Sequence, residues 1–210
     1  FKAQRRINAN DLPPPAVKLA LLGTAIRELS RAGYRYIGMD HFALPDDPLS
    51  RAQDAGTLQR NFQGYSTHGQ CDLVGLGMSA ISHVGACYAQ NARDLPGYYQ
   101  RLESGELPIV RGVALDAEDE LRAELIQSIM CRGRVQFDDF ERRFGIRFDR
   151  HFRREMATLA ALAADGLVQL HEYGFSVTAG AWLLLRVVAM AFDASLRRPE
   201  APVRNFSRVI

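Results

Sequence analysis

The chain has 210 residues, of which 47% are hydrophobic and 24% charged, ordinary values for a globular protein that buries a core. Its 26 Lys and Arg residues nearly balance its 24 Asp and Glu residues, which leaves a formal net charge of +2. This balance gives no electrostatic reason to expect nucleic acid or an acidic membrane as the main partner. The most apolar segment, residues 179–192, is too short for a membrane span and contains Arg186.

The cysteines and the amino terminus suggest a part of a longer cytoplasmic protein. Cys71, Cys87 and Cys131 are odd in number, and their spacing fits neither a disulfide framework nor a compact metal motif. We therefore expect three buried or half-buried thiols. The sequence starts at Phe1 without a methionine or a signal peptide, so we interpret it as a piece of a longer polypeptide.

The first third of the chain predicts alternating helices and strands. Residues 1–12 look irregular, and prolines 13–15 then open a helix whose apolar spacing reaches Gly33. Residues 34–39 form a β-prone run, so helix, glycine and strand follow one another as in an α/β layer or barrel. A short helix is expected over 49–57.

Asp40 and His41 follow the first predicted strand, at the end where α/β barrels collect their ligand sites. Two interpretations stand side by side: an acid–base pair, or a carboxylate that fixes nearby backbone. Neighbouring residues of a strand point to opposite faces, which favours the structural role. The remaining histidines, at 68, 83, 151 and 171, stand alone.

The run Arg60-Asn61-Phe62-Gln63-Gly64-Tyr65 is the strongest candidate site from its chemistry. Amide side chains need polar partners when buried, and a glycine lets backbone approach another molecule closely. Either this run is a loop that holds a polar ligand beside an aromatic face, or it is an ordinary polar loop with one packed aromatic side chain.

Residues 72–78 are expected to form a second buried strand, with residues 79–84 continuing from its end. The glycines at 75 and 77 permit close backbone approach or mark a bend. On this pattern, segments 60–65 and 79–82 face the same end of one sheet.

Helical signals dominate after residues 105–111. Asp116 is a helix cap, Phe137, Phe140 and Phe144 form an apolar stripe suited to packing, and another helix runs over 152–164. A hairpin over 167–178 and a helix over 179–196 follow, and the arrangement resembles a winged-helix module. The tail 197–210 looks irregular.

Four ordered segments resemble the oxygen-independent coproporphyrinogen III oxidase (coproporphyrinogen dehydrogenase) family, radical S-adenosylmethionine enzymes of haem synthesis. The segments are Gly-Met-Asp-His-Phe-Ala at 38–43, Arg-Asn-Phe-Gln-Gly-Tyr at 60–65, Gly-Met-Ser-Ala-Ile-Ser at 77–82 and Asn-Phe-Ser-Arg-Val-Ile at 205–210. The resemblance runs along the whole chain and covers the later half of that family's chain.

The resemblance implies a fold of class α/β plus α. Residues 1–105 would form the last strands and helices of an incomplete (β/α) radical-SAM barrel, and residues 106–210 a mainly helical, winged-helix-like domain that covers the active site.

The resemblance also implies an activity. A [4Fe-4S] cluster reduces S-adenosylmethionine, and the 5′-deoxyadenosyl radical takes a hydrogen from two propionates of coproporphyrinogen III in turn, giving the vinyl groups of protoporphyrinogen IX. The family's three-cysteine motif is missing from these 210 residues, so we expect the piece alone to be inactive. A separate electron donor is implied as a partner, and the parent is expected to be a monomer without nucleic acid or membrane partners.

Residue by residue, the resemblance assigns cofactor contacts to Phe62, Gln63 and Ile81. Ile81 matches a position that contacts S-adenosylmethionine, and Phe62 and Gln63 match positions beside a second S-adenosylmethionine. An isoleucine packs on adenosine, a phenylalanine lines a pocket and an amide bonds a carboxylate or ribose. The resemblance names no catalytic residue and no metal ligand in this chain.

Two alternatives remain open. Relatives of this family without oxidase activity bind or transfer haem, and the upstream cysteine motif would distinguish them. A DNA-binding regulator that uses residues 130–192 is the other alternative, although the third predicted helix is not notably basic.

Overall fold

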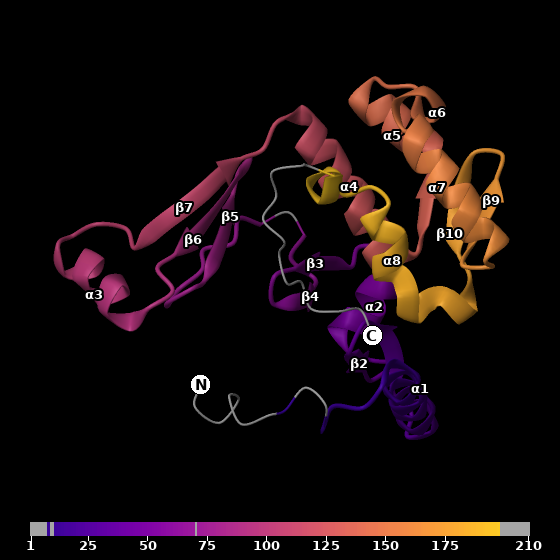
Figure 1. Cartoon of the computed structure of the whole chain (residues 1–210), viewed down its shortest axis with the longest axis horizontal. Coiled ribbons are helices and arrows are strands. Elements are labelled where there is room, and N and C mark those ends of the chain that lie inside the picture. The colour runs from indigo at the N-terminus through magenta and orange to yellow at the C-terminus, as the bar shows by residue number, and fades with distance from the viewer. Residues whose placement is uncertain (1–7, 9–10, 70, 198–210) are drawn as a thin grey trace.

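The computed structural model describes residues 8, 11–69 and 71–197, so the motif predicted at 205–210 lies outside the described residues. The helices are α1 Pro15–Arg31, α2 Pro48–Asp54, α3 Leu95–Glu103, α4 Ala117–Arg132, α5 Phe137–Phe144, α6 Phe148–His151, α7 Arg153–Ala164, η3 Ala179–Leu184, α8 Leu185–Met190 and η4 Ala194–Arg197. The strands are β1 Arg35–Gly38, β2 His41–Ala43, β3 Gln59–Asn61, β4 Gly64–Ser66, β5 Ile81–Val84, β6 Cys87–Asn91, β7 Ile109–Ala114, β8 Arg134–Gln136, β9 Val168–His171 and β10 Gly174–Val177. In Figure 1, β5, β6, β7 and α3 form a lobe beside the helical body of α4 to α8.

The first predicted helix and strand are confirmed. α1 begins at Pro15, whose fixed φ suits the first helical position, and the chain leaves the helix through Gly33 at a φ of 89°. β1 follows directly, and α2 falls within the helix predicted over 49–57 apart from its first residue, Pro48. No residue of α1 is buried, so this helix lies on the outside of the described structure.

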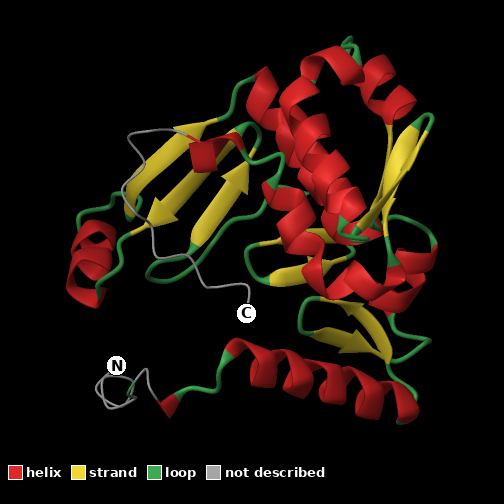
Figure 2. Ribbon diagram, turned by 45° about the vertical axis from the view of Figure 1, so that its right-hand side comes forward, coloured by secondary structure: helices red, strands yellow, loops and turns green. Residues whose placement is uncertain are grey.

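The predicted mixture of helices and strands is present, but every strand pair among the described residues is antiparallel. The sheets are β1-β2, β3-β4, β5-β6-β7 and β8-β10-β9, and no barrel closes (Figure 2). Tight turns such as Met39–Asp40 join β1 to β2, β3 to β4, β5 to β6 and β9 to β10, and turns this short allow only antiparallel pairing. β6 and β7 are joined by a longer connection that contains α3, and they also pair antiparallel.

The buried strand predicted over 72–78 is also wrong. Leu73 alone forms a β-bridge, with His83, and Leu76 is 86% exposed. The two glycine carbonyls of this segment, at 75 and 77, accept hydrogen bonds from Asn91 Nδ2 at 3.1 and 2.9 Å. A side chain thus replaces a strand partner, and the segment forms a loop along the β5 edge.

The helix predicted to start at Asp116 is confirmed as α4. Asp116 Oδ1 accepts a hydrogen bond from the Asp119 backbone amide at 2.8 Å. The Asp116 backbone amide in turn donates to the Asp119 carboxylate, which completes a capping box. Gly133 ends the helix in the left-handed region at a φ of 62°. α4 contributes much of its length to the core, with Leu121, Leu125 and Ile129 buried.

The phenylalanine stripe lies in the core, as predicted. Phe140 is buried and stands 6.1 Å, centroid to centroid, from the buried Phe148, which also stacks on Phe137. Phe152 and Phe192 continue this aromatic cluster towards α8. α4, α5, α6 and α7 pack around these rings and supply many of the buried side chains of the described core.

The hairpin predicted over 167–178 is confirmed as β9 and β10, whereas the single helix over 179–196 is wrong. That segment divides into η3, α8 and η4. Asp193 Oδ1 accepts from both the amide and the hydroxyl of Ser195, and this local side-chain bonding competes with helix continuation.

No helix of the described residues is long and apolar enough to cross a membrane.

Candidate functional site

Phe62 and Gln63 form the turn of the β3–β4 hairpin. Asn61 Oδ1 accepts from the Gln63 amide at 2.8 Å, which sets the turn, and both turn side chains are exposed. Gly64 follows at a φ of 137°, where a Cβ would collide with His41 Nε2. Only glycine fits this position, because a larger residue meets both backbone strain and the imidazole.

Two contacts join this hairpin to α4. The buried Tyr65 hydroxyl donates to the Met130 carbonyl at 3.0 Å, and Gln127 Nε2 donates to the Arg60 carbonyl. The Gln127 amide is itself oriented by the Cys131 thiol, which donates to its Oε1 at 3.3 Å. These bonds to α4 therefore fix the position of the exposed Phe62–Gln63 turn relative to the helical body.

Ile81 lies at the start of β5, in a row of directly paired residues that crosses the β5-β6-β7 sheet. Ile81 pairs with Gln90, and Gln90 pairs with Arg111. Directly paired residues share one face of a sheet, and so do residues two apart on a strand. His83 and Tyr88, which pair with each other, therefore lie on the same face as Ile81.

Phe62 reaches this same face of the sheet. Its ring meets the Tyr88 ring edge to face at a centroid distance of 5.3 Å, and Tyr88 stacks on His83 at 4.3 Å. Burial raises the pKa of the Tyr88 hydroxyl above its ordinary value. The structure thus brings Phe62 and the face of Ile81 together, although the two predicted segments belong to different sheets.

Two left-handed residues that are not glycine mark the same motifs. Among the described residues these are Met39, at a φ of 56°, and Ser79, at a φ of 60°. Met39 lies in the segment 38–43 and Ser79 in the segment 77–82. Such a backbone is unfavourable for side chains other than glycine, and strain of this kind concentrates at ligand sites.

The structure places Asp40 and His41 side by side, and among the described residues no backbone amide donates to the exposed Asp40 carboxylate, so neither interpretation of this pair is confirmed. Asp40 Oδ1 stands 2.8 Å from His41 Nδ1, and the imidazole lies edge on to the Tyr65 ring at 5.2 Å. The Nδ1 atom is buried, and the other ring nitrogen faces Gly64. His41 thus packs beneath the hairpin, where it shapes the Phe62–Gln63 turn.

The cysteines do not converge. The prediction of three buried or half-buried thiols is wrong for Cys71 and Cys87, which are exposed, and holds for Cys131, which is buried. The described residues contain no group of three His, Cys, Asp or Glu able to hold a metal ion. Burial raises the pKa of Cys131 to about 12. Its thiol keeps the proton that it donates to Gln127.

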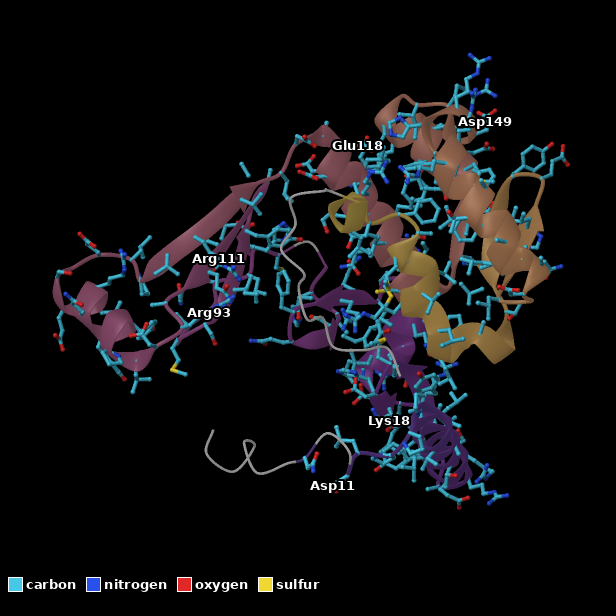
Figure 3. The ribbon with its side chains drawn as sticks, in the orientation of Figure 1. Asp11, Lys18, Arg93, Arg111, Glu118 and Asp149 are labelled. Atoms are coloured by element: carbon cyan, nitrogen blue, oxygen red, sulfur yellow. The ribbon has the colours of Figure 1, made fainter. Side chains whose placement is uncertain are left out.

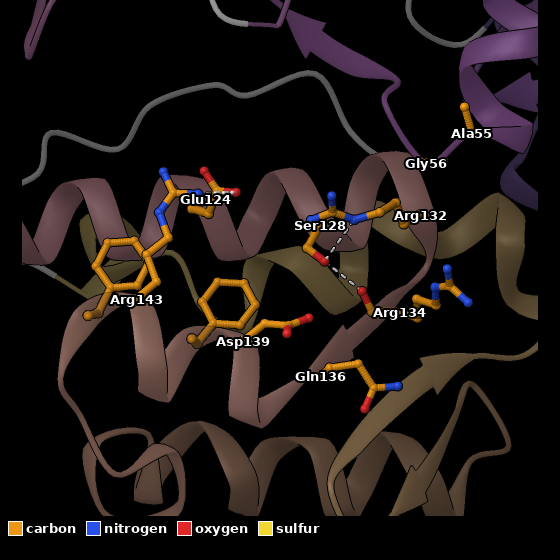
Figure 4. Close-up of a pocket in the computed structure, with 11 residues that line it drawn as sticks. Ala55, Gly56, Glu124, Ser128, Arg132, Arg134, Gln136, Asp139 and Arg143 are labelled. Carbon is orange, nitrogen blue, oxygen red and sulfur yellow. Dashed lines mark hydrogen bonds and ion pairs between the residues drawn. The ribbon is translucent and has the colours of Figure 1, made fainter.

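A separate cavity of about 560 Å³ lies against α4, α5 and β8, as Figure 4 shows. Ser128 in its wall donates to the Arg134 carbonyl at 2.6 Å and accepts from Arg132 Nε at 3.4 Å. Phe62, Gln63 and Ile81 do not line it. The site indicated by the sequence is an open sheet face, not this cavity.

The sequence patterns do not single out Tyr88, Gln90 and Arg111, which share the sheet face of Ile81. Alternation of residue type along β6 and β7 could indicate which side chains share a face, but only when the pairing of these two strands is known. No spacing along the sequence relates Gln90 to Arg111.

Comparisons with known proteins give one consistent result. Residues 115–184 match the family model of the HemN C-terminal domain. The chain is 50% identical over 210 residues to the oxygen-independent coproporphyrinogen III oxidase of Pseudomonas aeruginosa, covering 100% of this chain and 45% of that protein. It is 42% identical over 208 residues to the protein of the same name from Thermostichus vulcanus, covering 99% of this chain and 63% of that protein.

A solved structure is similar as well, that of coproporphyrinogen III oxidase (HemN) from Escherichia coli, which is described as a radical SAM enzyme. Its TM-score is 0.87 at 46% identity, over 93% of this chain and 45% of that one. The chain thus spans about half the length of most relatives it matches. The family resemblance carried by the motifs is confirmed.

Proposed function

We propose that this chain, a homologue of the oxygen-independent coproporphyrinogen III oxidases along its whole length, is part of an enzyme that oxidatively decarboxylates two propionates of coproporphyrinogen III to vinyl groups. The observation that carries the proposal is the contact of Phe62 with Tyr88, on the sheet face that holds Ile81. Phe62 and Ile81, two of the three residues assigned to cofactor contact, thereby border one surface, and Gln63 follows Phe62 in the same turn.

We assign Phe62, Gln63 and Ile81 to one wall of an S-adenosylmethionine site. The residues present fit this ligand: Phe62 is 58% exposed, so its free ring face is open to pack on an adenine or a methionine chain. Gln63 offers an exposed amide to a ribose hydroxyl or a carboxylate, and Ile81 offers an apolar surface. S-adenosylmethionine supplies, when bound, the radical that takes a propionate hydrogen.

The described residues of this chain do not fit an iron–sulfur cluster, because no three ligand side chains come together there. We therefore place the [4Fe-4S] ligands in a part of the enzyme outside this chain. A separate electron donor, a monomeric enzyme and a cytoplasmic location complete the proposal.

At the level of the fold, we propose that residues 1–105 complete a radical-SAM barrel and that residues 106–210 cover its active site. α4, α5, α7 and the β9–β10 hairpin follow the order of a winged-helix module, which supports a covering domain. β7 begins at Ile109 and pairs with β6, so the two parts share one sheet.

The proposal is tested in the complete protein by anaerobic turnover of coproporphyrinogen III. Gln63→Ala removes an amide assigned to cofactor contact and no iron ligand. We expect at least a tenfold loss of vinyl formation with an unchanged cluster absorbance, because a hydrogen bond to a charged group contributes about 1.5–3 kcal/mol. Gln100→Ala, the same change on the exposed surface of α3, serves as the control and keeps full activity. Lost cluster absorbance in the Gln63 variant, or an inactive wild type with a full cluster, contradicts the proposal.

A further inference from the structure

Arg111 ends the cross-strand row that starts at Ile81. Ile81, Gln90 and Arg111 are direct partners on β5, β6 and β7, so all three side chains leave the same face of the sheet. Strands lie about 4.8 Å apart, which places the Arg111 backbone roughly 10 Å from that of Ile81. An arginine side chain spans much of that distance.

A hydrogen bond from Nε holds the guanidinium of Arg111 in place. Arg111 Nε donates to Gln90 Oε1 at 2.7 Å, and Gln90 Nε2 donates in turn to the Ser79 carbonyl at 3.0 Å. Each end of the Gln90 amide has one partner of the right polarity, so its orientation is fixed. The chain of bonds ends on Ser79, one of the two left-handed residues that mark the motifs.

The outer edge of the same guanidinium faces solvent. Arg111 is exposed, and among the described residues it makes no ion pair with an Asp or Glu side chain. The two terminal nitrogens of a guanidinium form a planar fork that matches a carboxylate in two parallel hydrogen bonds. Within the part of the chain that the structure describes, Nε has its partner and neither terminal nitrogen has one, so the side chain is prepared for that geometry.

We propose that Arg111 binds a carboxylate of the ligand that lies on the Ile81 face, and that Gln90 orients it. The inference rests on the proposed function, in which two molecules with carboxylates meet at this site. One is the tetrapyrrole with its propionates, and the other is S-adenosylmethionine with its amino-acid carboxylate. The chemistry recognised is the same in both.

The test measures two affinities that require no turnover. In the complete protein, coproporphyrin III, the oxidised and unreactive form of the proposed substrate, is titrated by its fluorescence, and S-adenosylmethionine by calorimetry. Arg111→Met keeps the length and removes the fork. We expect one dissociation constant to rise about 10- to 100-fold, as for a lost charge-assisted pair, with the other nearly unchanged. The affected ligand identifies the source of the carboxylate.

Two further variants separate binding from general effects. Arg93→Met is the matched control, because Arg93 is also exposed but lies beyond the end of β6; both arginines are labelled in Figure 3. Arg111→Lys keeps the charge without the fork and is expected to recover part of the affinity.

Equal affinities in wild type and Arg111→Met overturn the inference, and so does an equal loss in Arg93→Met. A wild-type protein that binds neither ligand overturns the proposed function instead.

Discussion

At the scale of single residues, small groups decide where the Phe62–Gln63 turn stands. Gly64 leaves room for the His41 ring because it has no Cβ. The Tyr65 hydroxyl donates to a backbone carbonyl of α4, and the Gln127 side-chain amide donates to the Arg60 carbonyl. Cys131 completes this set, because its thiol fixes the Gln127 amide. The sequence alone identified the turn as polar, aromatic and glycine-containing. It did not reveal the α4 residues that support the turn, because they lie far from it along the chain.

We predict that the buried thiol of Cys131 makes the folded protein less stable at alkaline pH. Burial raises the pKa of its thiol from 9.0 to about 12, so above pH 9 the unfolded chain releases a proton that the folded chain keeps. The stabilisation is therefore complete below pH 9 and is lost as the pH rises towards 12. Between about pH 8 and pH 9.5 we expect the thiol to lower the free energy of unfolding by about 0.8 kcal/mol.

Urea unfolding at these two pH values measures the effect of Cys131. Cys131→Ala is expected to lack most of this decline, whereas Cys87→Ala, at an exposed thiol, keeps it. An identical pH dependence in wild type and Cys131→Ala would show that the buried thiol does not contribute.

At the scale of elements, α4 is the part that connects the others. It contacts β3, β8 and α8, and its Arg122 reaches three partners. Arg122 bonds Glu118 within the helix, Glu155 of α7 at 2.9 Å and the Phe192 carbonyl at 2.9 Å. α4 was predictable because its cap, apolar stripe and terminal glycine are local signals.

Other elements were not predictable from local signals. Residues 72–78 have the composition of a strand, but the Asn91 amide occupies the glycine carbonyls that a strand partner would need. Residues 179–196 have helical composition, but the Asp193 side chain ends the segment early. In both cases a side chain takes hydrogen bonds that the backbone would need to continue the strand or helix. A hydropathy pattern does not show where such side-chain bonds form.

Removing Arg122 is expected to destabilise the protein strongly. Glu155 is 3% exposed, so Arg122→Leu leaves a buried carboxylate without the guanidinium that pairs with it. We expect the free energy of unfolding to fall by about 3–5 kcal/mol, and the double variant Arg122→Leu/Glu155→Leu to recover much of it.

The same change at an exposed pair provides the control for Arg122. Arg143→Leu breaks the pair of Arg143 with Glu124, at 3.1 Å on the surface, and is expected to cost under about 1 kcal/mol. Urea unfolding measures the free energy of unfolding of each variant. Similar losses for Arg122→Leu and Arg143→Leu would refute the stabilising role assigned to the buried pair of Arg122 and Glu155.

At the scale of the whole molecule, a dense helical body stands beside an open lobe (Figure 1). The lobe and its neighbouring loop expose large apolar side chains, among them Leu76, Leu107 at 74% and Val74 at 67%. Surfaces of this kind mark contacts with other protein parts or with ligands. They agree with the proposal that the described lobe is one side of an enzyme's active site.

We propose that these 210 residues can replace the corresponding part of a coproporphyrinogen III oxidase. A chimera tests it most directly: the aligned 45% of the Pseudomonas aeruginosa relative is replaced by these 210 residues. Cluster content is first checked by absorbance, and protoporphyrinogen IX formation is then measured anaerobically. We expect two decarboxylations per substrate at a rate within about tenfold of the parent, which corresponds to a change of at most about 1.4 kcal/mol in the activation free energy. A soluble chimera with a complete cluster and no decarboxylation would contradict it.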